Sequence, residues 1–186
     1  MKRFFDISVG LFLFILLVIP ILLIAIKIKI TSKGSVLYWS ERVGRKNVNF
    51  LMPKFRSMRV NTPQLPTHLM IDPDDYLSPI GGLLRRSSLD ELPQLFTILK
   101  GDMSFVGPRP ALFNQDDLIA LRADQGVANL MPGLTGWAQV NGRDELAIPE
   151  KVALDVEYLE RQSFLFDMYI LWLTFLKVLR REGISH

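Results

Sequence analysis

The amino-terminal segment is the feature that most restricts how this chain can fold. Residues Ile7 to Ile26 form an almost unbroken apolar run of 20 residues. As a straight α-helix this run would be about 30 Å long, which matches the hydrocarbon core of a bilayer. A cleaved signal peptide is a poor interpretation, because the run is long and no small-x-small cleavage site follows it. The segment is therefore expected to stay in a membrane, either crossing it or entering and turning back.

Two features favour a helix that turns back. Lys2 and Arg3 precede the run, and lysines follow it at positions 27, 29 and 33. Cytoplasmic flanks are the ones rich in Lys and Arg, so both ends are expected on the cytoplasmic side. Pro20 removes the hydrogen bond to the Leu16 carbonyl and kinks the helix, which leaves halves of roughly 15–20 Å that are too short to cross alone. Because proline kinks also occur in spanning helices, crossing stays an alternative.

The composition limits the chemistry. The 186 residues, 49% of them hydrophobic, suit one compact domain with an appendage. The chain has no Cys and two His, which excludes disulfides, thiolate metal sites and a histidine-based zinc site, so any metal would be a hard cation held by oxygen. The net charge is only +3, but the basic residues are clustered along the chain, which suits an anionic membrane or phosphorylated substrates. Nucleic acid is not an expected partner, because no recognition motif is present.

The pattern predicts a mixed α/β fold that is mostly helical, with a membrane helix over residues 1–30 and a cytoplasmic catalytic domain over residues 31–186 on the membrane surface. Ser35 to Met58 predicts a β-hairpin, because β-branched and aromatic runs flank a polar Gly-Arg-Lys-Asn turn. Asn61 to Gly82 contains four prolines and is expected to be a loop, either an active-site cover or a plain connector. A helix is expected from Asp90 to Leu99, ended by Gly101.

Two more helices are expected near the carboxyl end. The first, Lys151 to Arg161, is amphipathic and offers the i, i+4 ion pairs Lys151–Asp155 and Glu157–Arg161. The second, over residues 163–181, is apolar except for a narrow polar stripe of Asp167, Thr174 and Arg181, with Lys177 beside it. It is either a core helix or an amphipathic helix at the membrane interface, with Trp172 at headgroup level.

The adjacent acids Asp90 and Glu91 lie at the expected start of a helix. Helix capping is the ordinary explanation, because Ser88-x-x-Glu91 fits a capping box. With Ser88 as the N-cap, however, Pro93 would lie where its N–H should bond the Leu89 carbonyl, whereas a start at Asp90 puts Pro93 inside the first turn. The positive helix end would then favour an ionised Asp90. Such a carboxylate is a competent nucleophile towards phosphorus, and two carboxylates can hold Mg²⁺.

Arginines around the acidic pair strengthen the phosphate interpretation. Arg85 and Arg86 lie one turn upstream, Arg109 stands between two prolines, and Arg143 follows an Asn-Gly turn. Guanidinium groups match phosphate geometry and neutralise the charge that develops in phosphoryl transfer. A surface salt bridge explains any single arginine well, but it is a weaker explanation for all four together.

Several motifs carry a resemblance to a known family. In order, "KFRSM", "RRSSLDELPQLFTILKGDMSFVGPRP" and "PGLTGWAQVNGR" follow an apolar helix with a central proline. This arrangement resembles the bacterial sugar transferase family, the small monotopic phosphoglycosyl transferases that begin the assembly of lipid-linked glycans such as O-antigen and capsule. The resemblance covers essentially the whole chain. One departure is Ile19, since re-entrant helices of this kind often carry Ser before the proline.

The resemblance implies a reaction in two steps. The family transfers a sugar phosphate from a UDP-sugar to undecaprenyl phosphate, with Mg²⁺, at the cytoplasmic face of the bacterial inner membrane. An aspartate attacks the sugar-bearing phosphate and releases UMP, and the lipid phosphate then attacks the aspartyl-phosphosugar. An N-acetylated hexosamine is the expected sugar, and a homodimer is allowed for.

Residue roles follow from the matched motifs. Asp90 corresponds to the nucleophile, and Glu91 to the second acid with a metal or supporting role. Substrate contacts are implied for the polar and basic residues of the motifs: Lys54, Arg56, Arg85, Arg109, Gln139 and Arg143. Two other functions stay open, a membrane-docked scaffold that binds anionic lipids and a Mg²⁺-dependent phosphohydrolase.

Overall fold

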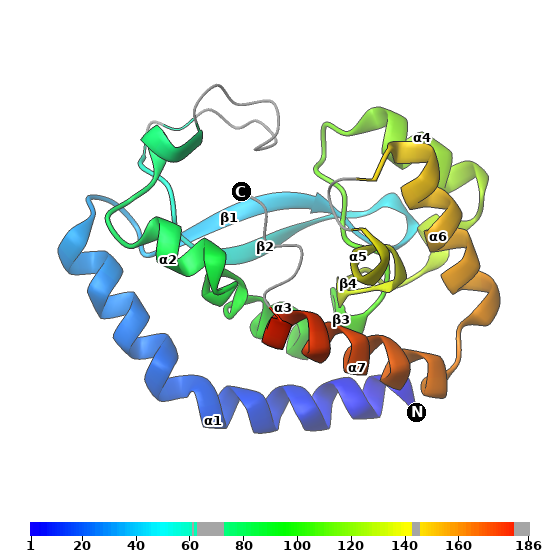
Figure 1. Cartoon of the computed structure of the whole chain (residues 1–186), viewed down its shortest axis with the longest axis horizontal. Helices are drawn as coiled ribbons and strands as arrows, with labels where there is room; N and C mark the ends of the chain where they lie inside the picture. Colours follow the sequence, from blue (N-terminus) through cyan, green and yellow to red (C-terminus); the bar gives the residue numbers. More distant parts are fainter. Residues whose placement is uncertain (61, 63–72, 143–145, 181–186) are drawn as a thin grey trace.

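The computed structural model describes residues 1–60, 62, 73–142 and 146–180. The helices are α1 (Lys2–Thr31), α2 (Gly81–Arg86), α3 (Gln94–Lys100), α4 (Asp116–Asp124), α5 (Trp137–Asn141), α6 (Ile148–Arg161) and α7 (Phe164–Arg180). The strands are β1 (Leu37–Val43), β2 (Asn49–Phe55), β3 (Ser104–Val106) and β4 (Gly133–Thr135), and 3₁₀ turns lie at η1 (Arg45–Asn47), η3 (Pro73–Tyr76), η4 (Leu89–Glu91) and η5 (Val127–Asn129). The predicted mixed, mostly helical fold with a β-hairpin and a long apolar first helix is confirmed (Figure 1).

Helix α1 is continuous over 30 residues and contains Pro20. Figure 1 shows it bending part-way along its length, as expected where a proline removes a backbone hydrogen bond. Within the described part of the chain, it is the one helix long and apolar enough to cross a membrane. Its middle is largely exposed, whereas Asp6 and Gly10 are buried near one end and Ile28 near the other. Both ends of α1 therefore pack against the same domain.

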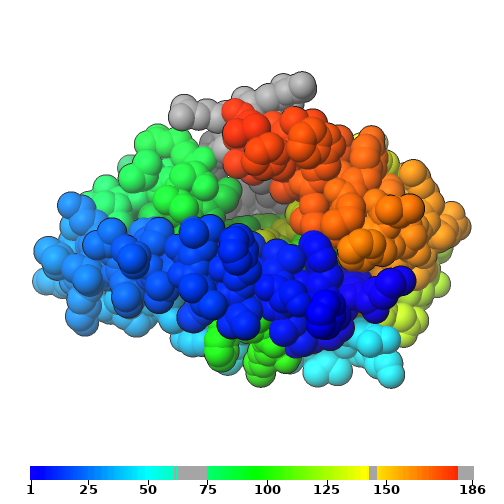
Figure 2. All heavy atoms as spheres, turned by 90° about the horizontal axis from the view of Figure 1, so that it is seen from below, coloured from blue at the N-terminus to red at the C-terminus, as the bar shows by residue number. Residues whose placement is uncertain are grey.

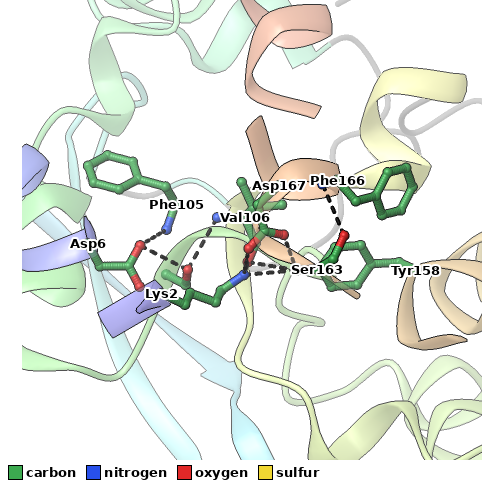
Figure 3. Close-up of polar contacts among 9 residues, drawn as sticks. Lys2, Asp6, Phe105, Val106, Tyr158, Ser163, Phe166 and Asp167 are labelled. Carbon is green, nitrogen blue, oxygen red and sulfur yellow. Dashed lines mark hydrogen bonds and ion pairs between the residues drawn. The ribbon is translucent and has the colours of Figure 1, made fainter. Parts of the chain in front are cut away.

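A polar network holds the amino-terminal end of α1 (Figure 3). Lys2 Nζ donates hydrogen bonds to the Val106 carbonyl at 2.8 Å and to Asp167 Oδ2 at 2.7 Å. Tyr158 OH donates to Asp167 Oδ1 at 2.7 Å, and burial, followed by the bond to Asp167, raises the pKa of Tyr158. Asp6 Oδ1 accepts hydrogen bonds from the backbone and a side chain of β3. Lys2 was predicted only as a basic flank, and it also ties α1 to β3 and α7.

Two small sheets position the loops. β1 and β2 pair antiparallel, with Leu37 opposite Phe55 and Val43 opposite Asn49, so the predicted hairpin is confirmed. β3 and β4 form a separate parallel pair. Where they meet, a Cβ on Gly133 would lie 2.1 Å from the Gly107 backbone nitrogen, which leaves no room for a side chain. The loop that begins at Gly107 therefore leaves β3 from a closely packed point.

The helix predicted from Asp90 starts later than expected. The acids lie in the 3₁₀ turn η4, and α3 follows from Gln94, with Pro93 as its N-cap. Ser88 has a left-handed φ of 54° and makes no side-chain capping bond, so the capping box does not form. Residues 89–91 instead form a tighter turn, in which Glu91 N donates to the Ser88 carbonyl at 3.2 Å and Leu92 N to the Leu89 carbonyl at 3.3 Å. Gly101 ends α3 with φ 104°, as predicted.

The segment predicted as a loop from Asn61 to Gly82 ends earlier than expected, because Gly81 and Gly82 belong to α2. A pair of glycines is a weak helix signal, which is why this helix was missed. A Cβ on Gly81 would lie 1.9 Å from the Ser57 carbonyl oxygen, so close packing requires glycine there. Residues 61 and 63–72 of the segment lie outside the described residues.

Helix α6 confirms one of the two predicted ion pairs. Arg161 bonds Glu157, four residues earlier on the same helix. Asp155, predicted to pair with Lys151, is buried and instead pairs with Arg122 of α4. The buried arginine fork donates two hydrogen bonds to Asp155, whereas the partly exposed lysine on the same helix can offer only a point charge.

Helix α7 turns a few polar side chains and part of the apolar core inward, and its outer face is apolar. Asp167 is bound in the network described above, Thr174 shares a hydrogen bond with Thr135, and Ile170 is fully buried. In contrast, Leu165 is 80% exposed and Trp172 56% exposed. Figure 2 shows α1 and α7 on the same side of the molecule. The polar stripe thus points into the domain, while Arg181 lies outside the described residues.

Candidate active site

The acidic pair occupies a junction of several elements. Asp90 and Glu91 lie on η4, between α2 and α3. Lys54 reaches them from β2, and Arg109 reaches them from the loop that follows β3. Residues from positions 54 to 109 therefore form one charged cluster.

Two basic side chains form ion pairs with Glu91. Lys54 Nζ and Arg109 Nη2 both donate to Glu91 Oε1, at 2.8 and 2.9 Å. Burial by itself would raise the pKa of Glu91, but the nearby Arg109 and Lys54 outweigh it and hold this pKa well below its usual range. Glu91 is therefore a permanently charged acceptor at physiological pH, and it fixes the direction of both cations.

The pKa of Asp90 shifts in the opposite direction, upward. The residue is only 9% exposed, and burial raises the pKa of its carboxyl above the usual 3.8. The positive charge of Lys54 opposes this rise, the neighbouring Glu91 adds to it, and Arg85 and Arg109 again oppose it. The sequence predicted a helix end at Asp90 that would favour the ionised form, but α3 begins only at Gln94, and burial has the largest effect on this pKa. A further positive charge would favour the ionised carboxylate.

The cluster fits a magnesium ion in one specific way. No group of three or more His, Cys, Asp or Glu side chains able to hold a metal is found among the described residues. Mg²⁺, however, often binds through one or two carboxylates and completes its shell with phosphate oxygens and water. Both cations bond Glu91 Oε1, so Glu91 Oε2 and the Asp90 carboxylate are the oxygens of this pair that the ion would use. The site fits Mg²⁺ that arrives with a phosphorylated substrate.

The other residues predicted to bind substrate differ in their contacts. Arg85, at the end of α2, acts on Asp90 through its charge. Gln139 in α5 is 9% exposed, and neither polar atom of its amide has a hydrogen-bond partner among the residues that the structure describes. Arg56 instead donates to Ser35 Oγ at 2.5 Å and to the Lys33 carbonyl at 3.4 Å, in the connection between α1 and β1. Arg143 lies outside the described residues.

An apolar groove of about 340 Å³ lies under the hairpin. It is lined by side chains of α1, β1, β2 and the start of α3, including Phe14, Ala25, Pro53, Phe55 and Phe96. Successive side chains of a strand point to opposite faces, so Pro53 and Phe55 face this groove while Lys54 faces Glu91. The groove and the charged cluster are therefore on opposite sides of β2.

The sequence missed the residues behind the charged cluster. Arg122 of α4 donates through Nη1 to the backbone carbonyl of Arg109 at 2.8 Å, and it forms a buried ion pair with Asp155 of α6. The i, i+4 spacing on α6 suggested a different partner for Asp155. No local pattern links positions 109, 122 and 155, so this contact becomes visible only in the fold.

The chain is similar to known sugar transferases over its whole length. The sequence model of one family, described as bacterial sugar transferase, matches residues 1–181. An uncharacterized sugar transferase of Bacillus subtilis, EpsL, is 38% identical over 188 residues, which cover 100% of this chain and 90% of that protein.

Longer relatives match with only part of their length. The undecaprenyl-phosphate glucose phosphotransferase of Komagataeibacter xylinus is 38% identical over 186 residues, 93% of this chain and 35% of that protein. The undecaprenyl-phosphate galactose phosphotransferase of Salmonella typhimurium is 38% identical over 167 residues, 81% of this chain and 34% of that protein. This chain thus spans about a third of the length of these two phosphotransferases.

Proposed function

Because the chain belongs to the bacterial sugar transferase family, we propose that it moves a sugar 1-phosphate from a UDP-sugar to undecaprenyl phosphate and releases UMP. The observation that carries this proposal is the charged cluster, in which a buried Asp90 stands beside a Glu91 held by Lys54 and Arg109. Such a cluster suits a phosphate with a large negative charge. The names of the two phosphotransferases, which specify a glucose or galactose group and undecaprenyl phosphate, support the same class of reaction.

In the first step, a carboxylate oxygen of Asp90 attacks the phosphorus that carries the sugar. A new P–O bond to Asp90 forms, the bond to the bridging oxygen of the diphosphate breaks, and UMP leaves with that oxygen. Arg109 and Lys54 can stabilise the charge that develops on the phosphoryl oxygens. Glu91 positions both cations through its Oε1 atom.

In the second step, a phosphate oxygen of the lipid acceptor attacks the same phosphorus. The bond from phosphorus to Asp90 breaks, which restores the carboxylate, and undecaprenyl diphosphate sugar is the product. Asp90 is a good leaving group here, because an acyl phosphate releases a stabilised carboxylate. Asp90 and Glu91 would hold Mg²⁺. The bound ion would neutralise phosphate charge and favour the ionised form of Asp90.

Further contacts with the UDP-sugar are proposed for four residues. Arg85 lies close enough to Asp90 to influence its pKa. The amide of Gln139, which has no partner within the described part of the chain, can bind a polar group of the nucleotide. Roles for Arg56 and Arg143 stay predictions. An N-acetylated hexosamine as the sugar, and a homodimer, are predictions of the same kind.

A membrane location on the cytoplasmic face of the inner membrane fits the exposed apolar surfaces of α1 and α7. We propose that α1 enters the bilayer and turns back, because its first turn is bonded to β3 and α7 while Ile28, near its other end, packs with Phe55 and Leu84. A helix that crossed the membrane would carry these two ends to opposite sides. The outer face of α7, with Trp172, would lie at the membrane interface.

The topology predicts a specific labelling result. Since the chain has no Cys, a cysteine at each end of α1 reports on that end alone. We expect neither an amino-terminal Met-Cys extension nor Lys33→Cys to react with an impermeant maleimide in intact cells, while both react after lysis. Labelling of one of the two in intact cells would show that α1 spans.

The pH dependence follows from the raised pKa of Asp90. Its carboxylate must be ionised to attack, so kcat/KM is expected to fall on the acid side at a pH above 3.8, the usual pKa. Arg85 lowers this pKa, so Arg85→Met should raise it and move the acid limb to higher pH. Profiles of UMP release for both proteins check this, with Lys100→Met, which removes an exposed positive charge, as the control. An unchanged acid limb in Arg85→Met would contradict the assignment.

The proposed reaction is tested with purified protein in nanodiscs, undecaprenyl phosphate and Mg²⁺. A panel of UDP-sugars should include N-acetylated hexosamines, glucose and galactose, and one of them is expected to yield UMP and a lipid-linked sugar in equal amounts. Release of free sugar phosphate without lipid product would favour the phosphohydrolase. No turnover, with anionic-lipid binding that survives loss of both acids, would favour the scaffold.

A further inference from the structure

The loop that carries Arg109 lacks a backbone N–H donor at two of its positions. Arg109 lies between Pro108 and Pro110, and proline supplies no backbone N–H. The prolines restrict the φ angles of the loop, but they cannot donate hydrogen bonds that attach it to the domain. The placement of Arg109 therefore also depends on the hydrogen bonds that the rest of the domain donates to this loop.

Four consecutive carbonyls of the loop each accept a hydrogen bond from outside it. The donors come from β4, α4 and β1, and the pairs are Gly133 N to Pro108 O at 2.9 Å, Arg122 Nη1 to Arg109 O at 2.8 Å, Arg42 Nη1 to Pro110 O at 3.2 Å, and Val43 N to Ala111 O at 2.9 Å. The bond to Arg109 itself comes from a side chain. Its strength and direction thus depend on how Arg122 is held.

Asp155 holds Arg122. Arg122 is 8% exposed and Asp155 1% exposed. Nε and Nη2 of Arg122 donate to Asp155 Oδ2 at 2.9 and 2.6 Å, which leaves Nη1 to bond the Arg109 carbonyl. The planar guanidinium makes both contacts at once, with its nitrogens at fixed angles.

We infer that Arg122 and Asp155 are positioning residues that set the direction of Arg109 towards Glu91 and the transferring phosphoryl group. A continuous series of contacts runs from Asp155 through Arg122 and the Arg109 backbone to Glu91 Oε1. Neither Arg122 nor Asp155 needs to touch the substrate. The role in catalysis rests on the proposed transferase function, whereas the fixing of Arg109 does not.

A purely structural ion pair is the competing explanation. Removing one partner of a buried pair usually destabilises a protein strongly, and this alone would lower activity. A positioning role differs in that its effect passes through Arg109. The effect must therefore disappear when the Arg109 side chain is already absent.

A double-mutant cycle separates the two explanations. Arg122→Lys keeps the charge but lacks the fork, and we expect kcat per active site to fall about 10- to 100-fold, as for small misplacements of a catalytic group. Active sites are counted from the UMP burst, so partly unfolded protein does not contribute. In an Arg109→Ala background, Arg122→Lys is expected to change kcat less than about twofold. Equal effects in both backgrounds would overturn the inference.

Two further variants serve as a control and as a substitute for Arg122→Lys. Arg161→Lys changes the Glu157–Arg161 pair on the same helix as Asp155 and should leave kcat within about twofold of wild type, since that pair is exposed. If Arg122→Lys does not fold, Asp155→Asn replaces it in the same cycle, with the same expected loss of effect in the Arg109→Ala background.

A measurement without turnover distinguishes this inference from the proposed function. NMR relaxation of the Arg109 Nε–H group should report an ordered side chain in wild type and a mobile one in Arg122→Lys. If the wild type releases no UMP but Arg109 is more mobile in Arg122→Lys than in wild type, the transferase proposal fails and the positioning role of Arg122 holds. If Arg109 stays equally ordered in both proteins, the positioning is wrong whatever the activity.

Discussion

Asp90→Asn is expected to abolish UMP release, with kcat lowered on the order of 10⁴-fold or more, as for loss of other catalytic nucleophiles. The amide has nearly the shape of the carboxylate but cannot attack phosphorus. Because burial disfavours the charged form of Asp90, the variant should unfold at the same temperature as wild type or higher. Single-turnover UMP release and a thermal melt measure both effects.

The matched control for this variant is Asp102→Asn. Asp102 forms an exposed pair with Lys100, so its loss should leave turnover within about twofold, as expected for surface ion pairs. More than 1% of wild-type turnover in carefully purified Asp90→Asn would rule out Asp90 as the nucleophile.

Arg109→Ala is expected to lower kcat by about 10³-fold, in the range seen when an arginine that stabilises phosphoryl transfer is removed. Arg109→Lys should recover part of this loss, because it keeps the charge but loses the planar fork. Both should affect kcat more than KM for the UDP-sugar, because the charge that Arg109 meets grows in the transition state. Steady-state kinetics with a saturating lipid acceptor measures these constants.

Arg45→Ala is the comparison for Arg109. Arg45 lies in η1 and donates to the Asn129 carbonyl in an exposed contact, so little change in kcat is expected. An Arg109→Ala enzyme that retained a kcat within tenfold of wild type would show that Lys54 or a metal carries the charge stabilisation instead.

Local patterns were sufficient to predict several parts of the fold. The hairpin follows from its β-branched runs and polar turn, and Gly101 ends α3 because a left-handed residue is needed there. Glu91 and Arg109 were chosen from positions 18 residues apart, and the fold joins them by one hydrogen bond. Each of these predictions depended on short-range chemistry that the sequence states directly.

Long-range contacts explain most of what the sequence did not predict. Asp155 pairs with Arg122 rather than Lys151, because burial between α4 and α6 favours a fork that can also reach Arg109. Lys2 looked like a flanking charge but binds Asp167, far along the chain. The start of α3 lies later than expected, because the chain after the left-handed Ser88 first makes a 3₁₀ turn that contains both acids. None of these follows from a pattern within one segment.

The most direct test of the proposed mechanism is to mix the enzyme with its UDP-sugar and Mg²⁺ in the absence of undecaprenyl phosphate. We expect one UMP per active site in a rapid burst, and intact-protein mass spectrometry should show the added phosphosugar on the peptide that contains Asp90. Addition of the lipid acceptor should then remove the adduct as lipid product appears. Turnover with both substrates, but without a burst or an adduct, would contradict a covalent intermediate and indicate direct transfer to the lipid.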